Sequence, residues 1–413
     1  MKQSGIDWIG EIPDGWEINK IDSLYTLRNE KVSDKDYPPL SVTMQGVVPQ
    51  LATAAKSDDS DNRKLVKKGD FAINSRSDRR GSSGVSNYDG SVSLINTVLI
   101  PRGEMNPIYY NWLFHTIKFE DEFYKWGHGI VDDLWTTRWQ DMKNIFIPLP
   151  PLAEQQKIAS YLDKKISQID AIITEAKQSI EEYKAWKQSV IFEAVTGKES
   201  KKEWIKLKYI TKYNISTLAE NTSADYNFNY IDIGSVKFGE GITCFQNMNF
   251  GEAPSRARRI VNKNDIIISS VRTYLRAIAK ISESEIPQIA STGFVVFSAD
   301  KNKLVPEYLF YAISSENFIS NVESNSVGIS YPAINASQIA NFKILVPSLE
   351  EQKNIAEYLD SKCTKIDSLI AEKESLIADL AEYKKSLIFE VVTGKKQVSS
   401  CEFSKENSGK RSV

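Results

Sequence analysis

The sequence predicts an α+β protein in which two mixed α/β globular segments are joined by two long antiparallel helices. These helices would form a coiled-coil spacer that arises from a pseudo-twofold internal repeat. Three observations predict this fold. One long stretch of the chain occurs twice at a constant offset. Each copy lacks proline and glycine throughout its interior. The segment ahead of each copy contains short β-branched runs that are typical of strands.

Length and composition set the first limits. The chain has 413 residues, of which 41% are hydrophobic and 26% are charged, so it can build two or three packed domains. A wholly disordered chain is therefore excluded. Lys and Arg total 52 against 54 Asp and Glu, which gives a formal net charge of −2. Any binding to nucleic acid must therefore come from local basic patches.

Cysteine usage and hydropathy indicate the compartment. The three cysteines, Cys244, Cys363 and Cys401, are far apart and odd in number, which argues against a disulfide framework. The first residues lack the apolar core of a secretory signal. No run of about 18 apolar residues occurs. We therefore expect a cytoplasmic protein without a membrane span.

The internal repeat is the most informative feature. The first copy opens with Pro150–Asp163 and closes with Phe192–Lys198; the second opens with Pro347–Asp360 and closes with Phe389–Lys395. The offset of 197 residues (359 − 162) holds between these ends without a gap. The chain thus alternates between two diverged segments and two near-copies of one element.

Each copy of the repeat is predicted to be helical. Pro150 and Pro347 stand just ahead of the predicted starts, and Gly197 and Gly394 stand at the predicted ends. Apolar residues recur at alternating spacings of three and four, which is the pattern of a coiled-coil seam. The residues predicted to pair the helices are Ile166, Ile173, Ile180, Ile366, Ile370 and Ile377.

Two irregularities modify this picture. Lys187 and Lys384 interrupt the seam, which we expect to drift toward Trp186 and Tyr383. We expect the Tyr-Leu-Asp segments at 161–163 and 358–360 to separate a short helix from a long one. The long helix would have about 29 residues and a length of about 43 Å.

A helix with one apolar stripe needs a partner, and the nearest partner is its own repeat. Antiparallel pairing would place the two globular segments at opposite ends of a rod. The alternative is that each helix closes a local core by itself. We favour pairing, because near-identity along the whole helix exceeds what packing alone requires.

The diverged segments are predicted to mix strands and helices. The expected strands cover residues 70–74, 92–100, 265–269 and 294–297, and the expected helices lie near 109–118 and 307–315. The tail after Lys395 is rich in Ser and Lys and is expected to be disordered.

Motifs for catalysis are missing from the sequence. It contains no Gly-x-x-x-x-Gly-Lys-Ser/Thr, His-Glu-x-x-His or Cys-x-x-Cys. With only His115 and His128, a zinc site would lack ligands. Asp36–Leu40 has two prolines, but not in the order of an amino-methyltransferase loop, and indicates an extended turn. We therefore predict no catalytic, metal or cofactor site in this chain.

Basic loops follow the equivalent expected strands at 70–74 and 265–269. The first loop covers Ser75–Gly84 and the second covers Ser270–Arg276, with a basic stretch, Pro254–Arg259, just ahead of it. Arginine can contact guanine bidentately in the major groove, and Ser adds further contacts. One such loop could be ordinary solvated surface. Two in equivalent positions favour contact with DNA.

A third candidate region precedes each copy of the repeat, at 126–130 and 325–331. Its aromatic and small polar residues could touch bases, or could equally close the domain against the helix. His128 alone is weak evidence for function. The residues that we predict to contact DNA are Ser75, Arg76, Arg79, Arg80, His128, Arg256, Arg258, Arg259, Arg272, Tyr274, Arg276, Ser326 and Tyr331.

This organisation resembles the specificity (S) subunit of type I restriction-modification systems. The resemblance rests on Asp7–Trp16, on the twin Leu-Pro-Pro-Leu-x-Glu-Gln-like openings and on the twin Ile-Phe-Glu-x-Val-Thr-Gly-Lys endings. The repeated parts match closely, whereas the diverged parts match only in layout. Asn264 stands where the first half has Gly69, which leaves the shape of that turn open.

The resemblance implies target recognition domains over 1–149 and 199–346, conserved helical spacers over 150–198 and 347–395, and a tail over 396–413. Each recognition domain would read one half of a bipartite, asymmetric DNA target. The spacers would dock two modification (methyltransferase) subunits, and two restriction (motor-nuclease) subunits could join. S-adenosylmethionine, ATP and Mg would bind only to those partners, and this chain would be non-catalytic.

Helix length then predicts the target spacing. A spacer of about 43 Å is close to one turn of B-DNA, about 34–36 Å. We therefore predict half-sites of about three to four base pairs, centred about one turn apart, with about six to seven unread pairs between them.

Two other functions stay open at this point. A fused DNA methyltransferase or nuclease would need a cofactor motif that the sequence lacks. A coiled-coil protein-interaction adaptor need not bind DNA at all. Salt separates these functions, because a DNA reader loses affinity steeply as counterions are released.

Overall fold

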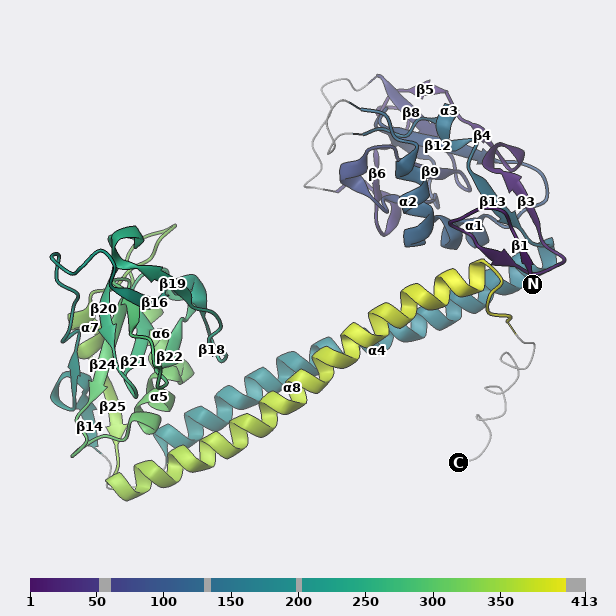
Figure 1. Ribbon diagram of the computed structural model, residues 1–413. Helices are drawn as coiled ribbons and strands as arrows, with labels where there is room; N and C mark the ends of the chain where they lie inside the picture. The colour runs from purple at the N-terminus through teal and green to yellow at the C-terminus, as the bar shows by residue number, and fades with distance from the viewer. Residues whose placement is uncertain (52–60, 130–134, 198–202, 399–413) are drawn as a thin grey trace, which may run out of the picture. The chain divides into compact units, whose positions relative to one another are not determined.

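The computed structural model describes residues 1–51, 61–129, 135–197 and 203–398 (Figure 1). Ile130 and residues 399–413, which include most of the tail expected to be disordered, lie outside the described residues. The chain forms two compact units. Unit 1 contains Met1–Ala176 and Ser375–Val413, and unit 2 contains Lys177–Glu374. Each unit therefore combines one globular domain with parts of both long helices.

The domain of unit 1 is β-rich. Its main sheet has the order β10-β9-β12-β4 and is antiparallel. The strands are β1 (Lys2–Gln3), β2 (Glu11–Ile12), β3 (Glu17–Lys20), β4 (Tyr25–Leu27), β5 (Lys31–Val32), β6 (Leu40–Thr43), β7 (Gly46–Pro49), β8 (Arg63–Val66), β9 (Phe71–Asn74), β10 (Ser83–Val85), β11 (Gly90–Val92), β12 (Asn96–Pro101) and β13 (Phe146–Leu149). The helices are α1 (Pro107–Phe114), α2 (Ile117–Lys125) and α3 (Trp139–Met142).

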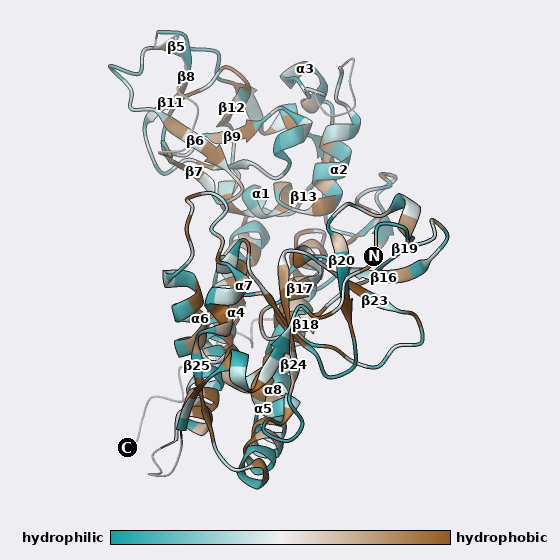
Figure 2. Ribbon diagram, turned by 90° about the vertical axis from the view of Figure 1, so that its left-hand side faces the viewer, coloured by the Kyte–Doolittle hydropathy of each residue, from teal (hydrophilic) through white to brown (hydrophobic). Residues whose placement is uncertain are grey.

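The domain of unit 2 has two four-stranded sheets, with the orders β15-β24-β21-β22 and β19-β16-β23-β20. Hydrophobic residues run along central strands such as β24 (Figure 2). The strands are β14 (Glu203–Lys206), β15 (Thr211–Tyr213), β16 (Asn227–Ile231), β17 (Val236–Lys237), β18 (Gly241–Ile242), β19 (Gln246–Asn249), β20 (Ala257–Val261), β21 (Ile266–Ser269), β22 (Ile278–Lys280), β23 (Gln288–Ser291), β24 (Phe294–Ala299) and β25 (Lys343–Val346). The helices are α5 (Pro306–Ser314), α6 (Glu316–Ser324) and α7 (Ala336–Ala340).

Three of the four expected strands are confirmed as β9, β21 and β24. The fourth, at 92–100, is wrong as a single strand. It divides into β11 and β12, because the Asn96 backbone N–H and side chain both donate to the Ser93 carbonyl oxygen and make a turn. The helix expected at 109–118 also divides, into α1 and α2. Thr116 interrupts it by capping α2 through the Phe119 N–H.

The two repeats form the long helices α4 (Leu152–Thr196) and α8 (Leu349–Val392). The expected break at Tyr-Leu-Asp is wrong. Leu162 and Leu359 are buried in the domain cores, and no Gly or Pro interrupts the helical hydrogen bonds there. Each helix is therefore continuous and about 66 Å long. The 43 Å length from which the half-site spacing was predicted is consequently wrong.

The pairing of α4 with α8 is antiparallel in both units. In unit 2 the Lys187 ammonium lies 2.7 Å from Asp367, and in unit 1 the Lys384 ammonium lies 2.6 Å from Asp170. These two ion pairs are equivalent under the 197-residue offset. The predicted α+β fold with paired long helices is thereby confirmed.

The lysines that interrupt the seam therefore pair across it. The expected drift toward Trp186 and Tyr383 is wrong, because both aromatic side chains are exposed. Long lysine stems can cover the seam while their charged ends reach the partner helix. Of the predicted pairing residues, Ile166, Ile180 and Ile366 are buried, and Ile173, Ile370 and Ile377 are half-buried.

A buried glutamine explains why the opening of the repeat recurs. The Gln155 side chain donates to the Pro150 carbonyl oxygen (2.8 Å) and accepts from the Asn106 N–H (2.9 Å). Gln352 does the same with Pro347 (2.9 Å) and Val305 (2.8 Å). Each glutamine thus ties the first turn of a long helix to its domain, and satisfies buried backbone groups that would otherwise be unpaired.

The end of the other long helix is attached by a tyrosine. In unit 1 the buried Tyr109 hydroxyl of α1 donates to the Val392 carbonyl oxygen of α8 (2.7 Å). In unit 2 the Tyr308 hydroxyl of α5 contacts the Val195 carbonyl oxygen of α4 (3.4 Å). Each domain therefore holds the start of one repeat and the end of the other.

Candidate nucleic-acid interface

The loops that follow β9 and β21 are both positioned by the same turn. Gly69 (φ 92°) and Asn264 (φ 69°) adopt left-handed backbone conformations at equivalent positions. The next residue, Asp70 or Asp265, accepts a hydrogen bond from the backbone N–H three residues before it, at 2.8 Å in both halves. Asn tolerates this conformation better than most residues. The turn therefore keeps its shape despite the exchange of Gly for Asn.

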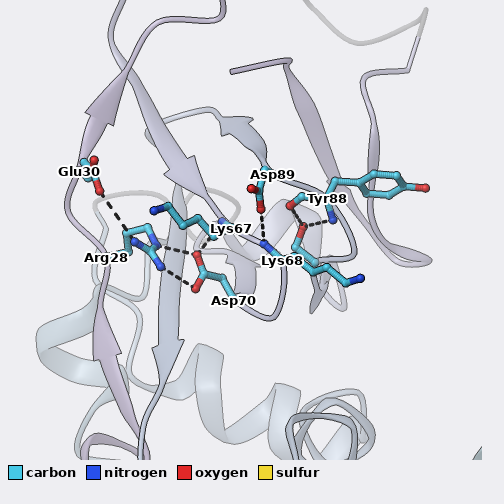
Figure 3. Close-up of polar contacts among 8 residues, drawn as sticks. Arg28, Glu30, Lys67, Lys68, Asp70, Tyr88 and Asp89 are labelled. Carbon is cyan, nitrogen blue, oxygen red and sulfur yellow. Dashed lines mark hydrogen bonds and ion pairs between the residues drawn. The ribbon is translucent and has the colours of Figure 1, made fainter. Parts of the chain in front are cut away.

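The remaining carboxylate contacts of the two aspartates differ. Figure 3 shows Arg28 directed at Asp70, with its Nε and Nη2 at 2.6 and 3.0 Å from the carboxylate oxygens. This hydrogen bonding raises the pKa of Arg28. Asp265 instead accepts from the Ser298 hydroxyl at 2.6 Å. Both arrangements fix the buried carboxylate and with it the start of the following strand.

The structure brings together the two loop regions that the sequence singled out in each half. In unit 1 the Thr137 N–H donates to the Ser75 carbonyl oxygen, and Thr136 and His128 exchange two backbone hydrogen bonds. In unit 2 the Ile334 N–H donates to Ser270, and Ala333 and Val327 exchange two. The same backbone frame, which we call the loop frame, therefore recurs in both units. It holds different side chains in each.

The basic side chains of the first loop frame are paired with acids. Arg76 Nε lies 3.0 Å and Arg79 Nε 3.8 Å from the Asp78 carboxylate. Arg80 pairs with Asp121 and lies over the Tyr124 ring. All three arginines remain partly or largely exposed. Their guanidinium groups are therefore oriented at the surface, and each keeps free donors.

Beside these arginines the surface of unit 1 is hollowed. An open hollow of about 490 Å³ is lined by Ser77, Asp78, Arg80, Asp121, Tyr124, Lys125 and Trp135. Ser75 does not reach this surface. Its side chain is buried, and its hydroxyl pairs with that of Thr97 at 2.9 Å. Ser75 is therefore a structural residue of the loop frame, not a contact candidate.

In the second loop frame, Arg272 and Arg276 have different surroundings. Arg272 is exposed, and its guanidinium lies 4.9 Å from the centre of the Tyr331 ring. Arg276 is half-buried and contacts Glu323 through Nε (2.8 Å) and Glu316 through Nη1 (2.9 Å). Hydrogen bonding to Glu323 raises the pKa of Arg276. Both arginines have positive φ, 50° and 52°. The short 3₁₀ turn between them is therefore tightly constrained.

The basic stretch Pro254–Arg259, ahead of β21, is linked to the second loop frame through the turn at Thr292 and Gly293. The Thr292 N–H donates to the Arg256 carbonyl oxygen, and the Ser270 N–H donates to that of Gly293, both at 2.8 Å. Arg256 is exposed, and its Nε donates to the Tyr230 hydroxyl (3.2 Å). Arg258 lies at a bulge in β20 and over the Phe250 ring, and Arg259 is half-buried.

The remaining predicted residues divide between surface and structural positions. His128 is largely exposed and lies 3.3 Å from Asp141. Tyr274 and Tyr331 are exposed. The Ser326 hydroxyl accepts from Thr273 (2.9 Å) and donates to the Val322 carbonyl oxygen (2.7 Å), so it ties the second loop to α6.

Sequence reasoning missed two groups of residues. Apart from Asp78, the acids that hold the arginines, Asp121, Glu316 and Glu323, are distant in sequence, and nothing in the local pattern pointed to them. Val327 and Ile329 are apolar yet strongly exposed. Their alternation with Gly328 and Ser330 was the signal that could have identified them.

The described part of the chain contains no group of three or more His, Cys, Asp or Glu side chains that could hold a metal ion. Among the helices that the structure describes, none is long and apolar enough to cross a membrane.

Fold and site together define a class: a protein of two internally related units, in which two unlike β-rich domains carry the same basic loop frame on a shared helix pair. The family model described as "Type I restriction modification DNA specificity domain" matches residues 13–182 and 190–377. The chain therefore belongs to this family, and is a DNA specificity subunit of a type I restriction-modification system. Such a subunit is a non-catalytic component of the complex.

Two specificity subunits are similar to this chain over different shares of its length. The type I restriction enzyme MjaVIII specificity subunit of Methanocaldococcus jannaschii is 25% identical, and the match covers 95% of each chain. The EcoBI specificity subunit of Escherichia coli is 24% identical over 61% of this chain and 59% of its own.

Solved structures share the fold. The HsdS subunit from Thermoanaerobacter tengcongensis has a TM-score of 0.55 at 15% identity, over 96% of this chain and all of its own. A chain from a structure described as the "structural basis underlying complex assembly and conformational transition of the type I R-M system" has a TM-score of 0.73 at 15% identity. It covers 94% of this chain and all of its own.

Proposed function

We propose that each globular domain reads one half of a bipartite, asymmetric DNA target through its loop frame. The observation that carries this proposal is the recurrence of one backbone frame with unlike side chains. In unit 1 the frame presents Arg76, Arg79 and Arg80. In unit 2 it presents Arg272 beside Tyr331. A shared frame suits a shared docking geometry, and different side chains suit different bases.

The assembly proposed around this chain follows the resemblance of the repeats. The paired helices α4 and α8 would set the distance between the half-sites and dock two modification subunits. Those subunits would bring S-adenosylmethionine and methylate adenine. Two restriction subunits with ATP and Mg would complete the nuclease. We place the complex in the cytoplasm, since Cys244 and Cys363 are free thiols.

The experiment is co-expression of the chain with its neighbouring modification subunit, followed by genome-wide mapping of methylated adenines. The expected result is methylation at one bipartite sequence with two unlike halves. Affinity of the purified complex for that target should fall steeply with salt. Absence of sequence-specific methylation together with salt-independent binding would refute the proposal.

A further inference from the structure

One loop of unit 2 exposes an unusual set of apolar side chains. Val327 is 81% exposed and Tyr331 is 65% exposed, and Ile329 between them is fully exposed. No other large hydrophobic side chain in the described part of the chain is as exposed as Ile329. We call Val327, Ile329 and Tyr331 the apolar finger. Single exposed apolar residues are common on protein surfaces, but three on one loop indicate a contact surface.

The apolar finger is held in place by the loop frame. Val327 exchanges two backbone hydrogen bonds with Ala333, at 2.8 and 3.0 Å. The Arg272 N–H donates to the Pro332 carbonyl oxygen at 2.7 Å, and its guanidinium lies over the Tyr331 ring. Gly328 supplies a φ of +118° that a side chain would strain. The finger is thus a fixed projection, and little ordering entropy is lost when it meets a partner.

The neighbours of the finger indicate what that partner is. Arg272 places a cation directly beside it, and the exposed Tyr274 lies on the adjoining loop. An apolar tip beside a guanidinium suits a surface that offers both negative charge and a small apolar group. The major groove of DNA has this combination. It is flanked by phosphates, and the thymine C5-methyl is the apolar group on its base edges.

We propose that the apolar finger reads thymine methyl groups in the half-site of unit 2, an inference that rests on the proposed function. Ile329 makes the methyl contact, and Arg272 binds the adjacent phosphate or guanine. At the first position of the finger the two loop frames differ. The residue equivalent to Val327 in unit 1, bonded to Thr136 as Val327 is to Ala333, is the polar His128.

Deoxyuridine tests this inference, because it removes only the methyl group and leaves every hydrogen-bonding atom of thymine in place. The complex with the modification subunit is titrated with its mapped target, in which each thymine of the unit 2 half-site is replaced singly by deoxyuridine. Loss of one methyl contact should weaken binding about fourfold.

Variants connect that loss to the finger. I329S should bind the thymine target about as weakly as the wild type binds the sensitive deoxyuridine target, and should no longer distinguish the two. I286S is the matched control, since Ile286 is also an exposed isoleucine of unit 2 but lies outside the loop frame. It should retain full affinity and full discrimination.

The outcomes are distinct. Specific binding with no sensitive thymine in the unit 2 half-site would overturn the inference and leave the proposed function standing. A second result would do the same: I329S weakens binding to the thymine target and to the deoxyuridine target by the same factor, so the complex still distinguishes them. That result is expected if the finger wedges between base steps instead. A complex without any sequence-specific DNA binding would overturn both.

Discussion

At the residue scale, the two arginines of the loop after β21 have different roles although their side chains are identical. Arg272 and Arg276 flank the same short turn, and both have left-handed backbone conformations. The carboxylates of Glu316 and Glu323 hold Arg276 within the domain. The Arg272 guanidinium lies over the Tyr331 ring, and the residue is exposed to solvent. Arg276 therefore positions the loop, and Arg272 is the candidate for contact with DNA.

Single substitutions should separate these roles. R276A leaves two carboxylates without their cation and should lower the free energy of unfolding of unit 2 by about 1–2 kcal/mol. R272A should leave thermal unfolding unchanged, and should weaken DNA binding by the complex by about 1–3 kcal/mol. Calorimetry of the chain and titration of the complex measure the two effects. A loss of stability in R272A with unchanged affinity would reverse the assignment.

The turn at Asn264 gives a second test at this scale. Its φ of 69° strains most residues that have a Cβ, and Asn less than most. N264A should therefore destabilise unit 2 by about 1 kcal/mol. N264G, which reproduces the residue found in the first half, should be neutral or slightly stabilising. Thermal unfolding of the pair measures the difference, and equal midpoints would show that the turn is not strained.

Whether the sequence predicts a feature of the site depends on how many residues separate the groups that interact there. The loops at 75–84 and 270–276 were predicted because the strands before them repeat. The regions around 128 and 327 were named, but their hydrogen bonds to Thr136 and Ala333 were not. The carboxylate partners of Arg80 and Arg276 lie still further along the chain, with Arg80 and Asp121 separated by 41 residues. Only the fold brings such partners together.

At the element scale, periodicity predicted the long helices but not the contacts of the lysines that interrupt their apolar seam. The spacing of apolar residues gave the seam, because that pattern depends on one helix alone. The partner of Lys187 could not be read from spacing, because it depends on the register between two helices. The structure supplies that partner as Asp367, and the equivalent pair is Lys384 with Asp170.

The seam can be tested with two isoleucines of α4. Ile180 is 7% exposed, whereas Ile172 is 46% exposed. I180D would bury an unpaired charge, and should destabilise the helix pair by about 3 kcal/mol or more. I172D should change stability by less than about 0.5 kcal/mol. Chemical denaturation compares the two, and assembly with the modification subunit should fail only for I180D. Equal behaviour of the two variants would refute the seam.

At the scale of the whole molecule, duplication has produced two units with separate cores. The core of unit 1 is rich in aromatic residues, among them Phe71, Tyr110 and Phe114. That of unit 2 contains more aliphatic residues, such as Ile266, Ile268 and Ile313. Different cores under the same loop frame allow each domain to diverge by itself, while the repeats keep their contacts.

Exchange of one domain tests this independence. Residues 203–346 are replaced by the corresponding segment of another member of the family, with α4 and α8 kept intact. One half of the methylated target should change and the other should remain as before. Mapping of methylated adenines provides the measurement. A change in both halves would show that the domains do not read independently.

The attachment of Tyr109 to the far end of α8 also has a consequence for how the protein is made. Leu387, Ile388, Val391 and Val392 belong to the core of unit 1. The ribosome therefore finishes the first domain at Leu149. It must then translate 243 further residues (392 − 149) before the last residue of that core, Val392, has been made. At about 5–20 residues per second, this delay is roughly 12–50 s. The nascent first domain therefore spends that time with the part of its apolar core that these four residues cover still open to solvent.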